Sequence, residues 1–568
     1  MSARLPIPGS DDNTWGNILN TFLAISHNSD GTLQTTAIQQ AGAITSVNGK
    51  DSTTGAVTLI ASDVGAATLA ETDNRYIAAG APVTAALTDE GGQVFNVKAF
   101  GATGNGTVDD TAAINAAISA TDSRGGIIFF PTGTYKVNSV GRTDVISSVS
   151  GTTIYDSSCA MNDIGSYCIG TGVNGRAMEI VAVNPGISFT VDTAPAEIPN
   201  SLFITKTPIV LSEGVQLVGS GSTFTTNGFG SGNASTSKIY DSGNGITILI
   251  RGSGPSTGNA ASRYKIQDLS VWGNAGSTYC GLFVSNMSWF LTIENCDLSF
   301  HGTAGAIFDG NINSHDIRNT IFYGNGSLTA TGHTGGVITN PFWSQPSAAL
   351  NFYNCFFNAN KGWGITGSEN GGAYAINLYG CQFNNTVATA APNSGTSMML
   401  SSQVYGSVNV IGCWSESATT YDLYTMGAVV IQGSHLASAT SYHWYNAGGS
   451  ATVIGCWFNN ASTATLQLGS GANVTWNTTT IEDPYFFSGG PANSVILGLG
   501  SSYGISSAGG GISPGSFGES TSNRVWQGSG LPPNTDGNDG DIYFRTDTPT
   551  VVNQRLYVRT SGSWMGII

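Results

Sequence analysis

Two neighbouring stretches of the chain decide its fold, FNVKAFGATGNGTVDDTAAINAAISA at residues 95–120 and GGIIFFPTGTYKV at residues 125–137. Within the second stretch, Ile127–Phe130 is wholly apolar, which is typical of a strand that is covered on both faces. Pro131, Thr132 and Gly133 follow directly and supply a turn. The main body of the chain is therefore expected to begin near Val94 with buried β-strands separated by tight turns.

The first stretch predicts a short helix. Thr107, Asp109 and Asp110 can cap it, and Thr111–Ala120 is rich in Ala and Ile. A stack of β-coils leaves unpaired strand edges at its open end, and such edges need a cover. We expect this helix to cover the first coil.

A repeated hexapeptide indicates that the coils continue along the chain. Its copies are IQDLSV from Ile266, IENCDL from Ile293, IRNTIF from Ile317, FYNCFF from Phe352, LYGCQF from Leu378, VIGCWS from Val410, VIQGSH from Val430 and VIGCWF from Val453. The third positions are Asp268, Asn295, Asn319, Asn354, Gly380, Gly412, Gln432 and Gly455. Most are 20 to 27 residues apart, which is one coil of a solenoid, and the longer spacings carry loop insertions. Asn and Gly at this position predict a turn with left-handed backbone angles.

The fourth position of the hexapeptide holds Leu, Thr or Cys, and we place it inside the coils. Five cysteines occupy it: Cys296, Cys355, Cys381, Cys413 and Cys456. Cysteines stacked in one column are expected to be small buried apolar groups, with metal binding or disulfides as the alternatives. Cys159 and Cys168 are nine residues apart, and the sequence leaves a bridge between them open.

The opening at residues 94–137 closely resembles the start of the pectate-lyase-like superfamily as found in phage tailspikes. The resemblance implies a right-handed parallel β-helix, an all-β solenoid, and a trimeric assembly. True pectate lyases use an acidic calcium cluster and a catalytic arginine. That set is not found in this sequence, so pectate-lyase activity is not implied.

The sequence divides into five predicted regions. Residues 1–45 form a helical attachment module, with Trp15, Ile18, Leu19, Phe22 and Leu23 on the apolar stripe of its helix, and residues 46–92 resemble a short β-repeat of tail fibres and a linker. The β-helix spans residues 93–505, a Gly/Ser linker follows at 506–520, and residues 521–568 form a small β-module with a hairpin around Ile542–Arg545 and Arg555–Val558.

Composition narrows the classes of function. The net charge is −16 with only 19 Lys and Arg residues, which argues against nucleic acid as a partner. No apolar run approaches the ~20 residues of a membrane span. Met1–Ser10 lacks the apolar stretch of a signal peptide. We therefore expect a protein that acts outside a cell as part of a particle, without membrane insertion.

Cleavage of a polysaccharide would need two carboxylates for hydrolysis, or a base with charge stabilisation for elimination. Acidic residues are sparse between residues 201 and 500, and Glu294, Asp297 and Asp268 are the catalytic candidates. We expect Glu294 and Asp297 to point outward on either side of one turn, no more than about 10 Å apart. The alternatives are that Glu294 pairs with Arg318 one coil further on and that Asp268 belongs to the ladder of turn residues.

Outward aromatic residues are the candidates for substrate binding. Phe356, Trp414 and Trp457 follow the cysteine column, and Arg318 lies beside Glu294 in the next coil. Aromatic rings can stack on sugars, although they can equally pack against a loop or another chain. The sequence predicts no cofactor and no metal, since the one metal considered, calcium, has no ligand set that supports it.

These features predict a tail spike or tail fibre of a phage or phage-like particle, located in the virion tail. It would recognise a bacterial surface polysaccharide, form a homotrimer and attach to a tail or baseplate protein through its N-terminus. Whether it also cleaves the glycan, as a hydrolase or a lyase, is left open. The alternatives are a non-catalytic adhesive fibre and a free bacterial polysaccharide-degrading enzyme.

Overall fold

The computed structural model describes most of residues 94–468, with gaps at 122–124, 171–176, 196, 223–235, 253–260, 275–277, 286–287, 311–312, 343–347, 368–374, 402–406 and 463. It also describes short stretches between residues 14 and 51 and between 472 and 567. The chain divides into two units, Met1–Ala81 and Pro82–Ile568. Among the described residues, no helix has the length and apolar character needed to cross a membrane.

The first unit contains one described helix, α1 (Trp15–Leu23), where the sequence predicts one. Strands β1 (Ser46–Val47) and β2 (Lys50–Asp51) form a small antiparallel pair. Most of the predicted β-repeat and the linker at 506–520 lie outside the described residues. The boundaries of these regions remain predictions.

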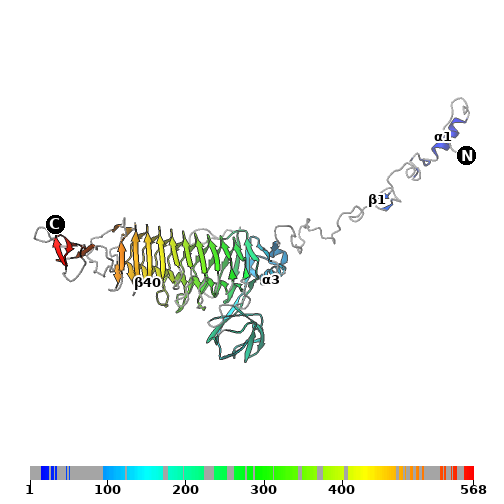
Figure 1. Ribbon diagram of the computed structural model, residues 1–568. Helices are drawn as coiled ribbons and strands as arrows, with labels where there is room; N and C mark the ends of the chain where they lie inside the picture. The colour runs from blue at the N-terminus through cyan, green and yellow to red at the C-terminus, as the bar shows by residue number, and fades with distance from the viewer. Residues whose placement is uncertain are drawn as a thin grey trace. The chain divides into compact units, whose positions relative to one another are not determined.

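The second unit is a stack of coils whose strands pair in parallel with the equivalent strands of the coils before and after (Figure 1). Each full coil contributes one strand to each of three faces, here named sheets 1, 2 and 3. This arrangement confirms the predicted right-handed parallel β-helix.

Sheet 1 contains the strands that lead into the predicted turn residues. They are β3 (Val94–Asn96), β5 (Gly126–Phe130), β15 (Val215–Gly219), β18 (Ala261–Ser262), β19 (Lys265–Gln267), β22 (Ser288–Trp289), β23 (Thr292–Glu294), β26 (Asn313–Arg318), β29 (Ala348–Tyr353), β32 (Ala375–Tyr379), β35 (Ser407–Ile411), β38 (Ala428–Gln432), the second half of β40 (Tyr442–Ile454), β43 (Ala472–Asn477) and β46 (Ser494–Leu497).

Sheet 2 contains the strands that follow the turn residues, together with their equivalents in the first and last coils. They are β4 (Asn105–Asp109), β6 (Gly133–Val137), β16 (Ser237–Asp241), β20 (Ser270–Trp272), β24 (Asp297–Ser299), β27 (Ile321–Tyr323), β30 (Phe356–Asn358), β33 (Gln382–Asn384), β36 (Trp414–Glu416), β39 (His435–Ala437), β41 (Trp457–Asn459), β44 (Thr480–Ile481) and β47 (Ser502–Tyr503).

Sheet 3 closes each coil. Its strands are β14 (Ile209–Leu211), β17 (Ile246–Ile250), β21 (Cys280–Val284), β25 (Ala304–Phe308), β28 (Gly335–Thr339), β31 (Trp363–Gly367), β34 (Thr396–Ser401), β37 (Tyr421–Met426), the first half of β40, β42 (Ala464–Leu468) and β45 (Phe487–Gly489). Strand β40 passes from sheet 3 to sheet 1 without interruption.

Helix α3 (Thr111–Ser119) packs against the first coil, as predicted, and buries Ile114, Ala117 and Ile118 in the core. The predicted capping is only partly correct. Asp109 accepts a hydrogen bond from the Thr111 backbone at 2.9 Å, whereas the Asp110 carboxylate binds the backbone of Thr103 and Gly104. Asp110 therefore fixes the preceding loop, which runs from the 3-10 helix η2 (Val97–Phe100) into β4.

The turn between sheets 1 and 2 has left-handed backbone angles at the third position of seven of the eight hexapeptide copies, from φ +47° at Asn319 to φ +63° at Gly380 and Gly412. The structure corrects one member of this column. Gln432 ends strand β38, and Gly433 (φ +56°) is the turn residue. The reason is steric, since glycine adopts a left-handed conformation without a penalty and glutamine does not.

The fourth position of the hexapeptide is buried in every copy except VIQGSH, which confirms its inward placement there; in VIQGSH Gly433 is exposed and the next residue, Ser434, is buried instead. All eight cysteines are free and buried, including Cys159 and Cys168, so neither that pair nor the column forms a bridge. Deeper in the core, Phe322, Phe357 and Phe383 stack with ring centroids 4.9 and 4.5 Å apart. Each such burial contributes about 1.5–3 kcal/mol to folding.

A module of antiparallel strands is inserted between strand β6 of sheet 2 and strand β14 of sheet 3. It contains the 3-10 helix η3 (Met161–Asp163) and strands β7 (Val140–Val145), β8 (Ser148–Ser150), β9 (Thr153–Tyr155), β10 (Tyr167–Ile169), β11 (Met178–Asn184), β12 (Ser188–Val191) and β13 (Ser201–Lys206). It has its own apolar core. This stretch lies within the β-helix predicted for residues 93–505, and the sequence pattern did not predict a separate module.

The C-terminal module contains β48 (Val525–Gly528), β49 (Ile542–Arg545), β50 (Leu556–Thr560) and β51 (Ser563–Gly566). Strands β49 and β50 form the predicted antiparallel hairpin.

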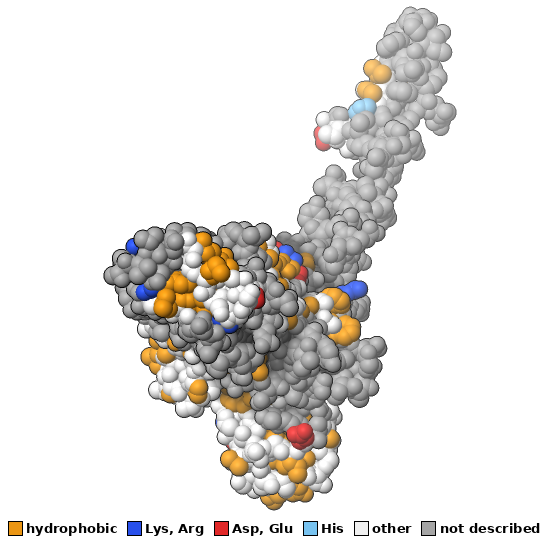
Figure 2. Space-filling model, turned by 60° about the vertical axis from the view of Figure 1, so that its left-hand side comes forward, with side chains coloured by type: hydrophobic (Ala, Val, Ile, Leu, Met, Phe, Trp, Pro, Cys, Tyr) orange, Lys and Arg blue, Asp and Glu red, His pale blue; other side chains and the backbone are white. Residues whose placement is uncertain are grey.

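Charged side chains are few on the face of the molecule that Figure 2 shows, as the composition leads one to expect.

Candidate functional site

One column of outward residues runs along sheet 2, at the first position of each strand beyond the turn. The register places Ser270, Asp297, Ile321, Phe356, Gln382, Trp414, His435 and Trp457 in line, with Lys238 of β16 preceding them. Strands in this arrangement are ~4.8 Å apart, so the side chains form a continuous strip. We name it the sheet 2 column.

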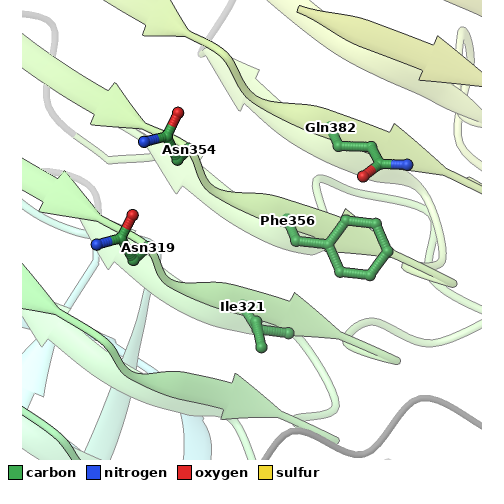
Figure 3. Close-up of a pocket in the computed structure, with 5 residues that line it drawn as sticks. All are labelled: Asn319, Ile321, Asn354, Phe356 and Gln382. Carbon is green, nitrogen blue, oxygen red and sulfur yellow. The ribbon is translucent and has the colours of Figure 1, made fainter. Parts of the chain in front are cut away.

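A groove of about 400 Å³ lies along the middle of this column. Its lining consists of Asn319, Ile321, Asn354, Phe356 and Gln382 (Figure 3). The two asparagines hold equivalent turn positions on successive coils, and the other three side chains follow on the strands beyond them. The groove thus presents amide groups beside apolar surface and contains no charged side chain in its lining.

The C-terminal half of the column is aromatic. Trp414 is 46% exposed and Trp457 is 42% exposed, and Phe356 is half-buried, so the predicted outward orientation of these three rings is seen. The ring of His435 lies between the two tryptophans, 4.3 Å from Trp457 and stacked on it, and 5.0 Å from Trp414. His435 Nε2 lies 2.9 Å from Asn459 Oδ1, which holds the imidazole in place.

His435 was missed in the sequence because the turn of its coil was set one residue too early, at Gln432. With Gly433 as the turn residue, Ser434 points inward and His435 falls into the column. The signal that identifies it is the glycine, which tolerates the turn conformation better than the preceding glutamine.

The carboxylate of Asp297 lies at the other end of the column. Although it was predicted to be outward and solvated, it is only 1% exposed. Trp272 Nε1 donates a hydrogen bond to Asp297 Oδ2 at 2.8 Å, and Ser299 Oγ donates to Oδ1. Neighbouring side chains on the outer face therefore remove this carboxylate from water, which sequence periodicity cannot reveal.

Burial raises the pKa of Asp297 from its ordinary value of 3.8 to about 7, against the opposing effect of its hydrogen bonds. Lys238 Nζ lies 4.1 Å from the Trp272 ring centroid, and burial lowers the pKa of this amine. A carboxyl group that titrates near neutral pH is suited to donate or accept a proton. Trp272 and Lys238 are the neighbours that the sequence did not single out.

Glu294 lies across the turn from Asp297, on the outer face of sheet 1. It aligns with Arg318 in the next coil, as predicted, but the two make their ion pairs elsewhere. Glu294 Oε2 lies 3.6 Å from Lys265 Nζ, and Arg318 Nη2 binds Asp316 Oδ2 at 2.7 Å while its guanidinium lies over the Tyr353 ring. The alternative of a Glu294–Arg318 pair is therefore not seen: Glu294 pairs with Lys265 in the coil before it, and Arg318 pairs with Asp316 on its own strand.

Asp268 is part of the ladder of turn residues. Its carboxylate accepts hydrogen bonds from Asn295 Nδ2 at 3.0 Å and from Gln267 Nε2 at 2.9 Å, and Asn319 Nδ2 in turn donates to Asn295 Oδ1 at 3.2 Å. In the part of the chain that the structure describes, no group of three His, Cys, Asp or Glu side chains is placed to hold a metal ion.

Comparison with known proteins gives a family match at the start of the β-helix and a short match to a second protein. Residues 94–162 match the family model "Rhamnogalacturonase A/epimerase, pectate lyase-like", which confirms the predicted pectate-lyase-like opening. A stretch of 45 residues is 56% identical to mannuronan C5-epimerase AlgE3 of Azotobacter vinelandii. It covers 8% of this chain and only 2% of that protein.

Solved structures similar to the chain include ORF18 of Geobacillus virus E2, with 18% identity, a TM-score of 0.41, and coverage of 70% of this chain and 61% of that one. The catalytic unit of the GH87 α-1,3-glucanase of Streptomyces thermodiastaticus is 14% identical with a TM-score of 0.42, and the match covers 74% of this chain and 70% of that one. Tailspike gp49 of the Acinetobacter baumannii phage Fri1, a capsular polysaccharide depolymerase, is 11% identical with a TM-score of 0.36, and the match covers 72% of this chain and 63% of that one.

Proposed function

We propose that the shaft binds a bacterial surface polysaccharide along the sheet 2 column. The observation that carries this proposal is the alignment of groove and rings in one strip, from Ile321 and Phe356 to Trp414, His435 and Trp457. Aromatic rings offer their electron-rich faces to the C–H groups of sugars, and Asn and Gln amides can donate to and accept from sugar hydroxyls. A long polymer can occupy successive coils, so that weak contacts add up along its length.

In this proposal the protein is a tail spike or tail fibre of a phage or phage-like particle and is located in the virion tail. It is a homotrimer that attaches to a tail or baseplate protein through its N-terminal region. The fibre-like sequence at residues 44–76 supports this, as does the low surface charge, which suits a polar uncharged partner. The family model that matches residues 94–162 and the protein that matches over 45 residues are both named for enzymes of sugar polymers, which supports a glycan as the partner.

Cleavage of the bound glycan is a second candidate function, and the pKa of Asp297 near 7 favours it. In this scheme Asp297 acts as the acid or base, with Glu294 across the turn as the second carboxylate and Asp268 in support. The scheme needs no cofactor and no metal. The adhesive alternative has the same groove without chemistry, and a free bacterial polysaccharide-degrading enzyme is the third alternative.

Binding is tested with Trp414→Ala and Phe356→Ala in the full chain, using affinity electrophoresis through gels that contain purified capsular polysaccharides. Phe290→Ala is the matched control, because Phe290 is an exposed ring outside the column. We expect each of these two variants of the sheet 2 column to bind about two- to tenfold more weakly and the control to bind normally. Unchanged binding in both column variants would refute the proposal.

Cleavage is tested on the same polymers. New reducing ends alone indicate a hydrolase, and added ultraviolet absorbance from an unsaturated sugar indicates a lyase. Loss of activity in Asp297→Asn or Glu294→Gln supports the catalytic assignment, and full activity in both refutes it. Retained binding with neither product supports the adhesive fibre.

A further inference from the structure

The outer face of sheet 3 changes character along the shaft. One column of outward residues runs through Phe283, Ile307, Ile338, Thr366, Met399, Tyr424 and Tyr445. The first five are at most 2% exposed. Phe283, Ile307 and Ile338 pack with Ile169 and Ala177 of the inserted module, and Met399 packs with Ala391. Tyr424 and Tyr445, in contrast, are only half-buried.

Two more tyrosines lie beside Tyr424 and Tyr445 on the same two strands. Tyr421 aligns with Tyr442 on the next coil, just as Tyr424 aligns with Tyr445. Ring centroids are 6.2 Å apart between Tyr421 and Tyr442, 5.0 Å between Tyr424 and Tyr445, and 5.7 Å between Tyr421 and Tyr445. We name these four residues the tyrosine cluster. All four are half-buried, so each ring keeps part of its surface open to solvent.

The two strands that carry the cluster, β37 and β40, present no charged side chain beside it. Asp422 and His443, the only ionisable side chains of β37 and β40 besides the tyrosines, point into the coil and are fully buried. Burial and the neighbouring phenols raise the pKa of Tyr421, which keeps its hydroxyl protonated and able to donate. The outward residue type therefore changes from apolar to tyrosine at the place where the cover ends. Packing alone does not require a phenol hydroxyl, because the covered positions are filled by Phe, Ile, Thr and Met.

We propose that the tyrosine cluster is a second polysaccharide-binding surface, separate from the sheet 2 column, which takes an uncharged stretch of glycan. This inference rests on the proposed function of the shaft. Rings repeated at the ~4.8 Å strand spacing match the length of about one sugar ring per coil. A polymer contacting both sheets would gain avidity without any change in either site.

The test uses the full chain with dextran and laminarin as neutral polymers, alginate and polygalacturonate as acidic ones, and purified capsular polysaccharides. Binding is measured for Tyr445→Ala, Tyr442→Ala and the milder Tyr445→Phe. Tyr155→Ala is the matched control, because Tyr155 is an exposed tyrosine of the inserted module. Thermal denaturation checks that each variant is folded. Tyrosine nitration, followed by mass spectrometry, reports which rings a bound polymer protects.

We expect Tyr445→Ala and Tyr442→Ala to weaken binding of an uncharged polymer about two- to tenfold, Tyr445→Phe to weaken it less, and the polymer to protect the cluster from nitration. Normal binding in the alanine variants, with Trp414→Ala still impaired, would overturn this inference alone. Failure of the wild-type chain to bind any polymer would overturn the proposed function as well. Protection that rises with protein concentration in the absence of polymer would assign the cluster to contacts between chains and overturn the inference.

Discussion

Asp422 and His443 form a pair in the interior of the coils, with Asp422 Oδ2 2.5 Å from His443 Nδ1 and both side chains fully buried. Ser415 Oγ donates a second hydrogen bond to Asp422 Oδ1 at 2.6 Å. Glycine holds the position of Asp422 two coils earlier, at Gly364, where a Cβ would lie 2.7 Å from the Phe383 ring. One coil further on, the smaller Ser415 holds the position of Phe383, and the space left by the missing ring accommodates the carboxylate of Asp422.

Removing one partner of this pair should be costly. We expect Asp422→Asn to lower the free energy of unfolding by about 3–5 kcal/mol, because His443 loses the buried carboxylate that binds it. Ser415→Ala is the control, since it removes one hydrogen bond and should cost about 1 kcal/mol. Urea unfolding followed by circular dichroism compares them. Equal losses in the two variants would show that the pair contributes no more than a single hydrogen bond.

The stability of the shaft should depend on the titration of Asp297. Its pKa is raised on folding from 3.8 to about 7, so the folded chain binds this proton more tightly than the unfolded chain does. Stability from this group is fully present below about pH 4 and is lost as pH rises towards 7. Asparagine does not titrate, so Asp297→Asn removes this loss of stability at high pH. The melting temperature of the variant should exceed that of the wild type at pH 8 but not at pH 4. Parallel melting curves across this range would contradict the assignment.

The ladder of turn residues predicts a difference between two substitutions at Asn295. Its φ of +52° is left-handed, and its side chain bonds to both Asp268 and Asn319. Asn295→Ala loses the bonds and strains the backbone by about 1–2 kcal/mol, whereas Asn295→Gly loses the bonds but relieves the strain. Thermal denaturation should therefore rank the wild type above the glycine variant and the glycine variant above the alanine variant. If alanine is as stable as glycine, the turn does not impose the left-handed angle.

The cysteines should be inert in the folded chain. All eight are buried and free, and burial raises the pKa of Cys296 to about 12 and of Cys456 to about 11. Because the thiolate is the reactive form, a thiol reagent should modify none of them in native protein and all eight in denaturant. The denatured sample is the control for reagent activity. Rapid labelling of the native chain would contradict the closed packing of the column.

The coils were predictable because their signal is local and repeated. Turn residues such as Asn295 and Gly380 need particular backbone angles, and the inward Cys296 and Leu298 alternate with outward residues, so sequence alone places them. The outward orientation of Trp414 and Trp457 follows from the same alternation. Because the turn of one coil was placed at Gln432 instead of Gly433, the position of His435 in the sheet 2 column was not recognised.

The environment of the candidate carboxylates was not predictable, since it depends on contacts between coils. Asp297 points outward as expected, yet it is buried beside Trp272, which is 25 residues away in the chain. Similarly, the register places Arg318 next to Glu294, yet Arg318 binds Asp316 on its own strand. The side-chain rotamer decides which carboxylate the guanidinium reaches. The sequence pattern predicts strand register, whereas the burial of a carboxylate depends on how the side chains of neighbouring coils pack together.

Arg251 should hold the inserted module to the shaft, because it contacts three elements of that module. Its Nε donates to the Ala177 carbonyl at 2.9 Å, its guanidinium pairs with Glu179 at 3.0 Å and with Asp192, and it lies over the Tyr167 ring. Lysine cannot make this set of bonds, so Arg251→Lys should weaken the contact by about 2 kcal/mol.

Hydrogen exchange measured by mass spectrometry should then show faster exchange in peptides from residues 140–206, with the coils from β23 onward unchanged. Arg318→Lys is the matched control, because the ion pair of Arg318 lies on the open face of sheet 1 and is worth little. Exchange in the module as slow as in the wild type would mean that the apolar contact of Ile169 and Ala177 with sheet 3 is enough to hold it. Faster exchange throughout the coils would instead make Arg251 a determinant of the whole shaft.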